Sequence, residues 1–273
     1  MFFTAGTNLE KVDLDMRKFY NKNGYIHIKN FFTDSEIDEC LNNIKKVFSN
    51  LTNQETNDKS LFNLYKNDIS TYLNGCKACH NLISIYKLML HENVIKLLKT
   101  IGVDFPAVNM KPVVMFSAKE LASHNFYWKT NPHQDFSGMK SSLDGIVIWI
   151  PLFDMKKEHG FIELVPESHT KGFYNHKETG PTFEICENID ESLFKEIETE
   201  KKDIILFSAF TIHRSGRNTS NEIRYAVNFR YDNFDEKTYV ERKYPQPFKY
   251  TRNECPSIDN ETICEFWKKK SNY

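Results

Sequence analysis

The sequence predicts a β sandwich or barrel with helices in front of it. From about Val108 onward, short β-branched and aromatic runs are divided by turn residues, and strands at this spacing are typical of sandwiches and barrels. Before that point, apolar residues recur at helical spacing behind a capping motif. The 273 residues, 40% of them hydrophobic, can bury one large core. We therefore expect a single domain over 1–273, with a helical N-terminal part and loop (1–107), core strands carrying the site (108–232) and a C-terminal tail packed on the body (233–273).

The N-terminal part is expected to run helix, strand, helix between residues 13 and 48. Thr33 and Glu36 form the pattern of a capping box, and apolar residues follow them at helical spacing. Residues 50–75 are rich in Asn, Thr, Asp, Lys and Ser, which favours a long loop that could act as a lid over the site. Another helix is expected over about 82–100, with Gly102 as its C′ residue.

Five β runs are expected to form the core. They cover residues 112–116, 145–150, 161–165, 203–207 and 223–231.

Charge and termini limit the class of partner. The 36 basic and 37 acidic residues nearly cancel, so there is no electrostatic reason to expect nucleic acid or an anionic membrane as partner, and a small-molecule substrate is favoured. The N-terminus has no basic and apolar leader pattern, and no apolar run is long enough to span a bilayer. We expect a soluble, cytoplasmic protein whose six cysteines are reduced thiols.

His133 and Asp135 stand two residues apart in strand-like sequence, so their side chains are expected to share one face. An imidazole and a carboxylate on one face are two-thirds of the 2-His-1-carboxylate facial triad, which holds non-haem Fe(II) and leaves coordination positions open. His213, at the end of an apolar strand, is the candidate third ligand. Taken alone, the first pair also fits a surface turn, and His213 also fits a hydrogen-bonded rim histidine.

The segment after His213 suggests a grip for a carboxylate. Turn formers follow His213 and a strand begins near residue 223, so the chain is expected to double back and place Arg224 beside His213. One face of that strand carries Arg224, Ala226, Asn228 and Arg230. If this face lines a cavity, Arg224 is a planar, charged fork suited to a carboxylate. A metal beside such a grip suits a chelating 2-oxo acid.

With these residues in place, the sequence resembles the phytanoyl-CoA dioxygenase family of Fe(II)- and 2-oxoglutarate-dependent oxygenases over most of its length. Glu167 stands where the family pattern usually has Gly, so the local turn departs from the pattern. The blocks that carry the resemblance are, in order, Phe19-Tyr-Asn-Lys-Asn-Gly-Tyr-Ile-His-Ile-Lys-Asn-Phe-Phe32, Pro132-His-Gln-Asp135, Glu158-His-Gly-Phe-Ile-Glu-Leu-Val-Pro-Glu-Ser-His169, Lys202-Asp-Ile-Ile-Leu-Phe207, and His213-x-Ser-x-x-Asn-x-Ser220 leading to Arg224.

The resemblance implies a double-stranded β-helix (jelly roll, cupin-like) core with N-terminal helices, and it implies roles for single residues. His133, Asp135 and His213 would ligate iron. Arg224 would pair with the distal carboxylate of 2-oxoglutarate, with Ser215 as a hydroxyl donor nearby. Trp149 would lie near the cosubstrate and Gln134 between two ligands, although core packing for Trp149 and an outward orientation for Gln134 are alternatives.

The implied reaction is hydroxylation of a C–H bond in a small-molecule metabolite. It would use Fe(II), 2-oxoglutarate and O2, and convert 2-oxoglutarate to succinate and CO2. The carboxylate of Asp135 occupies the position that a related halogenase leaves for chloride, which favours hydroxylation. The family acts on acyl-CoA thioesters, amino-acid derivatives, phosphonates, sugars and natural-product intermediates, and membership does not choose among them. Candidate substrate contacts, for which loop surface is the alternative, are His124, Asn125, Tyr127, Trp128 and Arg230.

Other interpretations stay open. Cys76, Cys79 and His80 match the Cys-x-x-Cys-His haem attachment pattern, and the cysteines could bind zinc only with two further ligands, for which His91 is a poor candidate. Ordinary thiols near a helix start are the plainer interpretation. For the whole chain, the alternatives are a metal-dependent cupin-type isomerase or hydrolase and a non-catalytic jelly-roll binding protein.

Overall fold

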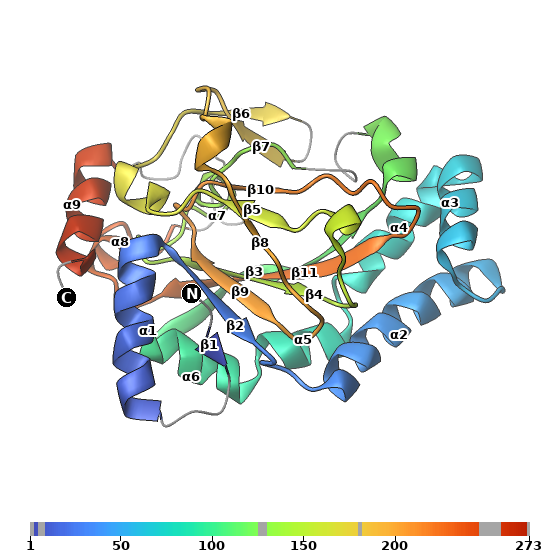
Figure 1. Cartoon of the computed structure of the whole chain (residues 1–273), viewed down its shortest axis with the longest axis horizontal. Helices are drawn as coiled ribbons and strands as arrows, with labels where there is room; N and C mark the ends of the chain where they lie inside the picture. Colours follow the sequence, from blue (N-terminus) through green and yellow to red (C-terminus); the bar gives the residue numbers. More distant parts are fainter. Residues whose placement is uncertain (1–2, 5–8, 125–129, 180–181, 246–257, 272–273) are drawn as a thin grey trace.

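The computed structural model describes residues 3–4, 9–124, 130–179, 182–245 and 258–271 (Figure 1). The α-helices are α1 (Leu9–Asn23), α2 (Asp34–Thr52), α3 (Asp58–Asn67), α4 (Ile69–Cys79), α5 (Ile83–Met89), α6 (Glu92–Thr100), α7 (Phe136–Met139), α8 (Lys237–Glu241) and α9 (Asn260–Ser271). The strands are β1 (Phe3–Thr4), β2 (Tyr25–Lys29), β3 (Pro106–Ser117), β4 (Ile146–Pro151), β5 (Ile162–Leu164), β6 (His176–Thr179), β7 (Thr182–Ile185), β8 (Lys195–Ile197), β9 (Ile204–Ser208), β10 (His213–Ser215) and β11 (Arg224–Asn233). Short 3-10 turns are η1 (Lys119–His124), η2 (Lys157–His159), η3 (Ser168–Lys171) and η4 (Glu191–Leu193).

Two sheets enclose the interior of the molecule. The major sheet has the order β1-β2-β9-β4-β11-β3, and the minor sheet has the order β10-β5-β8. The minor sheet lies over one face of the major sheet in Figure 1. The rings of Phe207 on β9 and His213 on β10 have centroids 4.5 Å apart, so side chains of both sheets meet between them. The β6–β7 hairpin lies beside the minor sheet (Figure 1).

Helices cover the opposite face of the major sheet (Figure 1). Phe116 on β3 packs edge-on against Phe48 of α2, and Tyr231 on β11 donates its hydroxyl to the Met89 carbonyl of α5. One continuous cluster of buried apolar side chains runs from Met16 to Trp267. The helical part and the sheets therefore share a core.

The alternation expected along β11 is present. Tyr225 packs against Phe116 of β3, which in turn packs against Phe48 of α2, and Tyr231 donates its hydroxyl to the Met89 carbonyl of α5. The side chain of Arg230 contacts Asp135 between the sheets instead. Because successive strand residues point to opposite faces, the set beginning with Arg224 faces the interior. The predicted polar face lines the space between the two sheets.

The prediction of a loop over residues 50–75 is wrong, because most of this stretch is helical. Helix α2 continues to Thr52, and α3 and α4 follow. The polar residues that suggested a loop include helix caps: Asn57 accepts from the Ser60 N–H, and Asp68 accepts from the Thr71 N–H. Tyr72 is fully buried between α2 and β3. The segment is part of the helical layer rather than a lid.

Two further expectations need correction in detail. The helix expected over 82–100 is broken into α5 and α6, because His91 is extended and caps α6 by accepting from the Asn93 N–H. Gly102 has φ +94, as a C′ residue requires. The turn after His213 is not a hairpin: β10 pairs with β5, whereas β11 pairs with β3 and β4. Between them the chain crosses from the minor to the major sheet.

The C-terminal tail contributes a helix that the sequence pattern did not reveal. Helix α9 packs beside α1 (Figure 1), and its fully buried Trp267 contacts Tyr20 and His169 edge-on. Among the helices that the structure describes, none has the length and apolar content to cross a membrane.

Candidate active site

His133 and His213 are brought together by main-chain pairing between two distant segments. The N–H of each histidine donates to the carbonyl of the other, both at 3.0 Å. Their ring centroids are 4.1 Å apart. His213 begins β10, whereas His133 makes only this isolated bridge.

Asp135 is placed by a helix start rather than by a strand, so the strand expected at this pair is wrong. Its backbone is helical (φ −63, ψ −22) and its carbonyl accepts from the Met139 N–H at the end of α7. The turn still directs the carboxylate toward the histidines, with Asp135 Oδ2 3.5 Å from His213 Nε2. One ligand atom from each of His133, Asp135 and His213 lies within 4.8 Å of the others. The three residues predicted as a triad do converge.

The hydrogen bonds select the tautomer of both histidines. His133 Nδ1 lies 2.7 Å from the Asn131 carbonyl, and His213 Nδ1 lies 3.0 Å from the Thr211 carbonyl. A carbonyl only accepts, so each Nδ1 donates and each Nε2 keeps its lone pair. Burial lowers the pKa of His133, and burial, with His133 as a neighbour that disfavours a second proton, lowers the pKa of His213 to about 3. Both rings are therefore neutral donors for a metal.

Asp135 is a buried anion with one oxygen engaged and one free of hydrogen bonds. Burial by itself raises the pKa of its carboxyl, but the charge of Arg230, which also donates hydrogen bonds to it, outweighs burial, and the pKa is lowered to about 2. Arg230 contacts Oδ1 at 2.9 Å through Nη2. Oδ2 has no hydrogen-bond partner among the described residues. Such an orphaned buried oxygen, beside two imidazole lone pairs, suits a cation.

Arg224 is buried on the interior face of β11, and its guanidinium contacts main-chain oxygens. Nη1 donates to the carbonyls of His159, Gly160 and Gly216. Burial lowers the pKa of Arg224 to about 10. No carboxylate of the described residues forms an ion pair with it. A buried, unpaired guanidinium is costly unless an anion joins it.

The remaining predicted cosubstrate contacts differ in their placement. Trp149 is buried opposite Asn228 in the β4–β11 ladder, so it shares the interior face. Ser215 accepts the Thr130 N–H at 2.6 Å. Gln134 does not support the predicted contact, because its amide donates to the Gly172 and Phe210 carbonyls and accepts the Tyr174 N–H. These bonds make Gln134 an anchor for surrounding loops.

Among the candidate substrate contacts, Arg230 lies at the triad, but it pairs with Asp135. His124 ends η1. Asn125, Tyr127 and Trp128 lie outside the described residues.

Two features of the site were missed by sequence reasoning. Asn228 lies between Arg224 and Arg230 on the interior face, and its Oδ1 is buried without a hydrogen-bond partner in the described structure. The period of two along β11 predicted its position on this face, but no role in the site was predicted for it. Asp58 of α3 accepts from the Ile223 N–H and the Tyr225 hydroxyl. No local sequence pattern predicts this contact, because Asp58 and Ile223 are 165 positions apart in the sequence.

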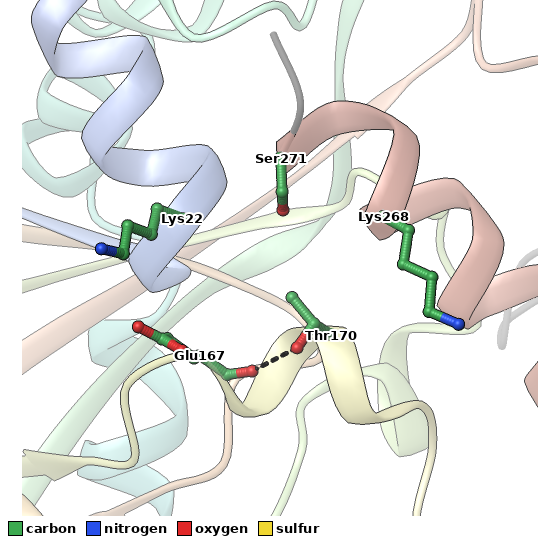
Figure 2. A pocket seen from close by; sticks show the side chains of 5 residues that line it. All are labelled: Lys22, Glu167, Thr170, Lys268 and Ser271. Carbon is green, nitrogen blue, oxygen red and sulfur yellow. Dashed lines mark hydrogen bonds between the residues drawn. The ribbon is translucent and has the colours of Figure 1, made fainter.

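Two other features do not compete with the triad. Cys76 and Cys79 are buried helical thiols whose pKa values are raised to about 12, chiefly by burial. Within the described residues, the triad is the group of side chains whose geometry could hold a metal ion, and it includes neither cysteine. A surface pocket of about 390 Å³ lies between α1, α9 and η3, and no triad residue lines it (Figure 2).

Glu167, which departs from the family pattern, adopts the conformation that Gly would supply. It has φ 64 and ψ −1, and its carbonyl accepts the Thr170 hydroxyl (Figure 2). The turn therefore forms despite the Cβ, at a cost of about 1 kcal/mol.

Solved structures show the fold. The structure named non-heme monooxygenase ThoJ, apo, is 15% identical, aligns over 80% of this chain and 77% of that chain, and has a TM-score of 0.60. The epimerase SnoN in complex with Fe3+, alpha ketoglutarate and nogalamycin RO is 16% identical over 82% of this chain and 84% of its own, with a TM-score of 0.58. EctD from S. alaskensis with 2-oxoglutarate and 5-hydroxyectoine is 12% identical over 85% and 80%, with a TM-score of 0.56. The expected double-stranded β-helix core with N-terminal helices is confirmed.

Sequence relatives point the same way. A phytanoyl-CoA dioxygenase domain-containing protein 1 homolog of Caenorhabditis elegans is 22% identical over 266 residues, covering 78% of this chain and 88% of the relative. The phytanoyl-CoA dioxygenase domain-containing protein 1 of Danio rerio is 26% identical over 166 residues, covering 56% and 54%. The profile of the family described as Phytanoyl-CoA dioxygenase (PhyH) matches residues 20–226. The chain belongs to the phytanoyl-CoA dioxygenase family.

Proposed function

We propose that this protein is an Fe(II)- and 2-oxoglutarate-dependent dioxygenase that hydroxylates a C–H bond of a small molecule. The observation that carries the proposal is the convergence of His133, Asp135 and His213, in a chain of this family. Two imidazoles and one carboxylate are the donor set of non-haem Fe(II) oxygenases.

The residues present fit the metal. Both histidines present an unprotonated Nε2, since their Nδ1 atoms are committed to carbonyls. Asp135 Oδ2 is buried without another partner in the described structure. The three protein ligands leave coordination positions for a chelating cosubstrate and O2. The structures of SnoN with Fe3+ and alpha ketoglutarate, and of EctD with 2-oxoglutarate, are of the same fold and support this cofactor set.

The residues also fit a dicarboxylate cosubstrate. Arg224 holds a buried charge that main-chain carbonyls solvate but do not neutralise. The distal carboxylate of 2-oxoglutarate would supply the missing anion through charge-assisted hydrogen bonds. Trp149 on the same interior face would exclude water from this region. Ser215 stays a predicted hydroxyl donor, with Thr130 as its present partner.

The roles of the chain are binding and orientation. When bound, iron, 2-oxoglutarate and O2 would supply oxidative decarboxylation to succinate and CO2 together with oxidation of the substrate C–H bond. The Nδ1 bonds hold each imidazole ring in the orientation that a metal requires. Asp135 and His213 are buried and His133 is half-buried, which shields the reacting centre from much of the solvent.

Hydroxylation is proposed over the other outcomes known on this fold. Structural neighbours include an epimerase and a carbocyclase as well as a monooxygenase. Asp135 keeps its carboxylate, so no vacant ligand position is left for a halide as in a halogenase. The proposed product is therefore the alcohol, and epimerised, cyclised and halogenated products are the outcomes to be screened against it.

The test is O2-dependent formation of succinate from 2-oxoglutarate by the Fe(II)-loaded protein. We expect His133→Ala and Asp135→Ala to reduce succinate formation by at least about a hundredfold with an unchanged circular dichroism spectrum, because each removes a ligand. His91→Asn, which replaces one helix cap by another far from the triad, should keep wild-type turnover.

Full turnover in either ligand variant would overturn the site assignment. Metal-dependent activity that needs neither O2 nor 2-oxoglutarate would instead support a cupin-type isomerase or hydrolase. A protein that binds metal but turns over nothing in a screen of acyl-CoA, amino-acid, phosphonate, sugar and natural-product substrates would support a binding role.

A further inference from the structure

Arg230, six residues after Arg224 on β11, contacts the candidate metal ligand Asp135. Its Nη2 lies 2.9 Å and its Nε 3.3 Å from the same oxygen, Asp135 Oδ1, across 95 residues of sequence. The Arg230 side chain is 13% exposed and that of Asp135 is 8% exposed. Two nitrogens of one rigid guanidinium on one buried oxygen define the direction of the carboxylate.

The two oxygens of Asp135 consequently differ. Oδ1 is engaged by Arg230, whereas Oδ2 has no hydrogen bond among the described residues and faces His213 Nε2. A carboxylate with both oxygens free can bind a cation through one or both of them. A carboxylate whose Oδ1 is held by a guanidinium presents one oxygen.

We propose that Arg230 is a positioning residue that restricts Asp135 to a single metal-ligating oxygen and so keeps a coordination position open for the 2-oxo acid. This inference rests on the proposed function. It replaces the expected role of Arg230 as a substrate contact. In this role Arg230 acts on the metal and the cosubstrate through Asp135, which is the carboxylate that its guanidinium contacts.

The pair is also suited to this role energetically. A buried carboxylate without a partner is costly, and a buried ion pair is stabilising only when its geometry is good. A lysine would place one compact charge near the carboxylate, whereas arginine presents nitrogens in a fixed fork. Arg230 Nη1 also lies 3.6 Å from Met110 Sδ, which packs the guanidinium on the strand beside it.

The test is a double-mutant cycle that combines Arg230→Gln with Asp135→Gly. The readout is the dissociation constant of 2-oxoglutarate for protein loaded with saturating Mn(II), measured by calorimetry without turnover. In the wild-type background, we expect Arg230→Gln to weaken 2-oxoglutarate binding by about tenfold or more, as for other groups that orient metal ligands. In the Asp135→Gly background, the same change should have an effect below about threefold, because the residue through which Arg230 acts is gone.

Two further variants complete the design. Arg230→Lys keeps the charge without the fork, so its loss of 2-oxoglutarate affinity should be intermediate, and it serves in the cycle if Arg230→Gln does not fold. Arg214→Gln removes an arginine that pairs with Glu163 and Glu191 instead, and it should bind 2-oxoglutarate as the wild type does.

Each outcome decides the proposal. An equal loss in both backgrounds would mean that Arg230 contacts the cosubstrate directly, and no loss in the wild-type background would mean that it has no positioning role; either overturns the inference alone. If wild-type protein loaded with Mn(II) binds no 2-oxoglutarate, the proposed function fails and the inference fails with it.

Discussion

At the scale of single residues, Arg224 carries a buried positive charge that no carboxylate of the described residues balances. It is 3% exposed and rests on main-chain carbonyls. Its identity and its face were predictable from the sequence, since the period of two along β11 places it with Arg230. Its carbonyl partners were not predictable, because two of them, on His159 and Gly160, come from a turn more than sixty residues earlier.

We predict that Arg224→Ala raises the 2-oxoglutarate concentration needed for half-maximal succinate formation by about tenfold or more. The change removes a charge-assisted grip of about 1.5–3 kcal/mol. Initial rates over a series of 2-oxoglutarate concentrations measure the effect, and Arg214→Ala is the matched arginine control. An unchanged requirement in Arg224→Ala would contradict the assignment.

His169 makes a second residue-scale prediction, about pH. Its Nε2 donates to the Asn21 carbonyl, and its Nδ1 is buried without a partner among the described residues. Burial lowers its pKa from 6.5 to about 4. The unfolded chain therefore binds this proton first, so stability is complete above pH 6.5 and is lost as the pH falls toward 4, by about 3 kcal/mol.

The measurement is the free energy of unfolding in urea at several pH values between those two pKa values. His169→Gln keeps a donor for the Asn21 carbonyl but has no titrating group. The stability advantage of wild type over this variant should shrink as the pH falls. A constant difference across the range would contradict the neutral, buried assignment of His169.

At the scale of elements, contacts between the helical layer and the sheets position the site. Asp58, the first residue of α3, accepts from the Ile223 N–H at 2.7 Å and from the Tyr225 hydroxyl at 3.0 Å. These residues flank Arg224 at the start of β11. The helices that replaced the expected lid thus hold the strand that carries the arginine.

We predict that Asp58→Ala destabilises the protein by about 1–3 kcal/mol, because it leaves a buried N–H and a buried hydroxyl without their acceptor. It should also raise the 2-oxoglutarate requirement, since the start of β11 is released. Urea unfolding and initial rates measure the two effects. Asp68→Ala, which removes a cap that serves only its own helix, should lower stability without changing the 2-oxoglutarate requirement.

At the scale of the whole molecule, we propose that the chain forms one domain. The buried cluster that runs from Met16 to Trp267 joins the helical layer, the sheets and α9. We predict a single cooperative unfolding transition, in which the calorimetric and van't Hoff enthalpies agree. Two resolved transitions in a calorimetric scan would show that the helical part and the sheets unfold separately.

Local sequence determined much of this protein. The five expected core strands, the capping box at Thr33, the positive φ of Gly102 and the interior face of β11 all follow from side-chain period and backbone preference. The family blocks named the three candidate ligands in order. These features depend on residues within a few positions of one another, so the chain itself displays them.

Only the tertiary structure decided how those parts meet. It paired His133 with His213, set Arg230 against Asp135, and turned the supposed loop over 50–75 into helices. A period of two states which face a side chain occupies, but not which distant segment lies opposite. That choice depends on the packing of the whole core, which includes contacts between residues more than a hundred positions apart in the sequence. Local conformational preferences do not determine which of these distant contacts form.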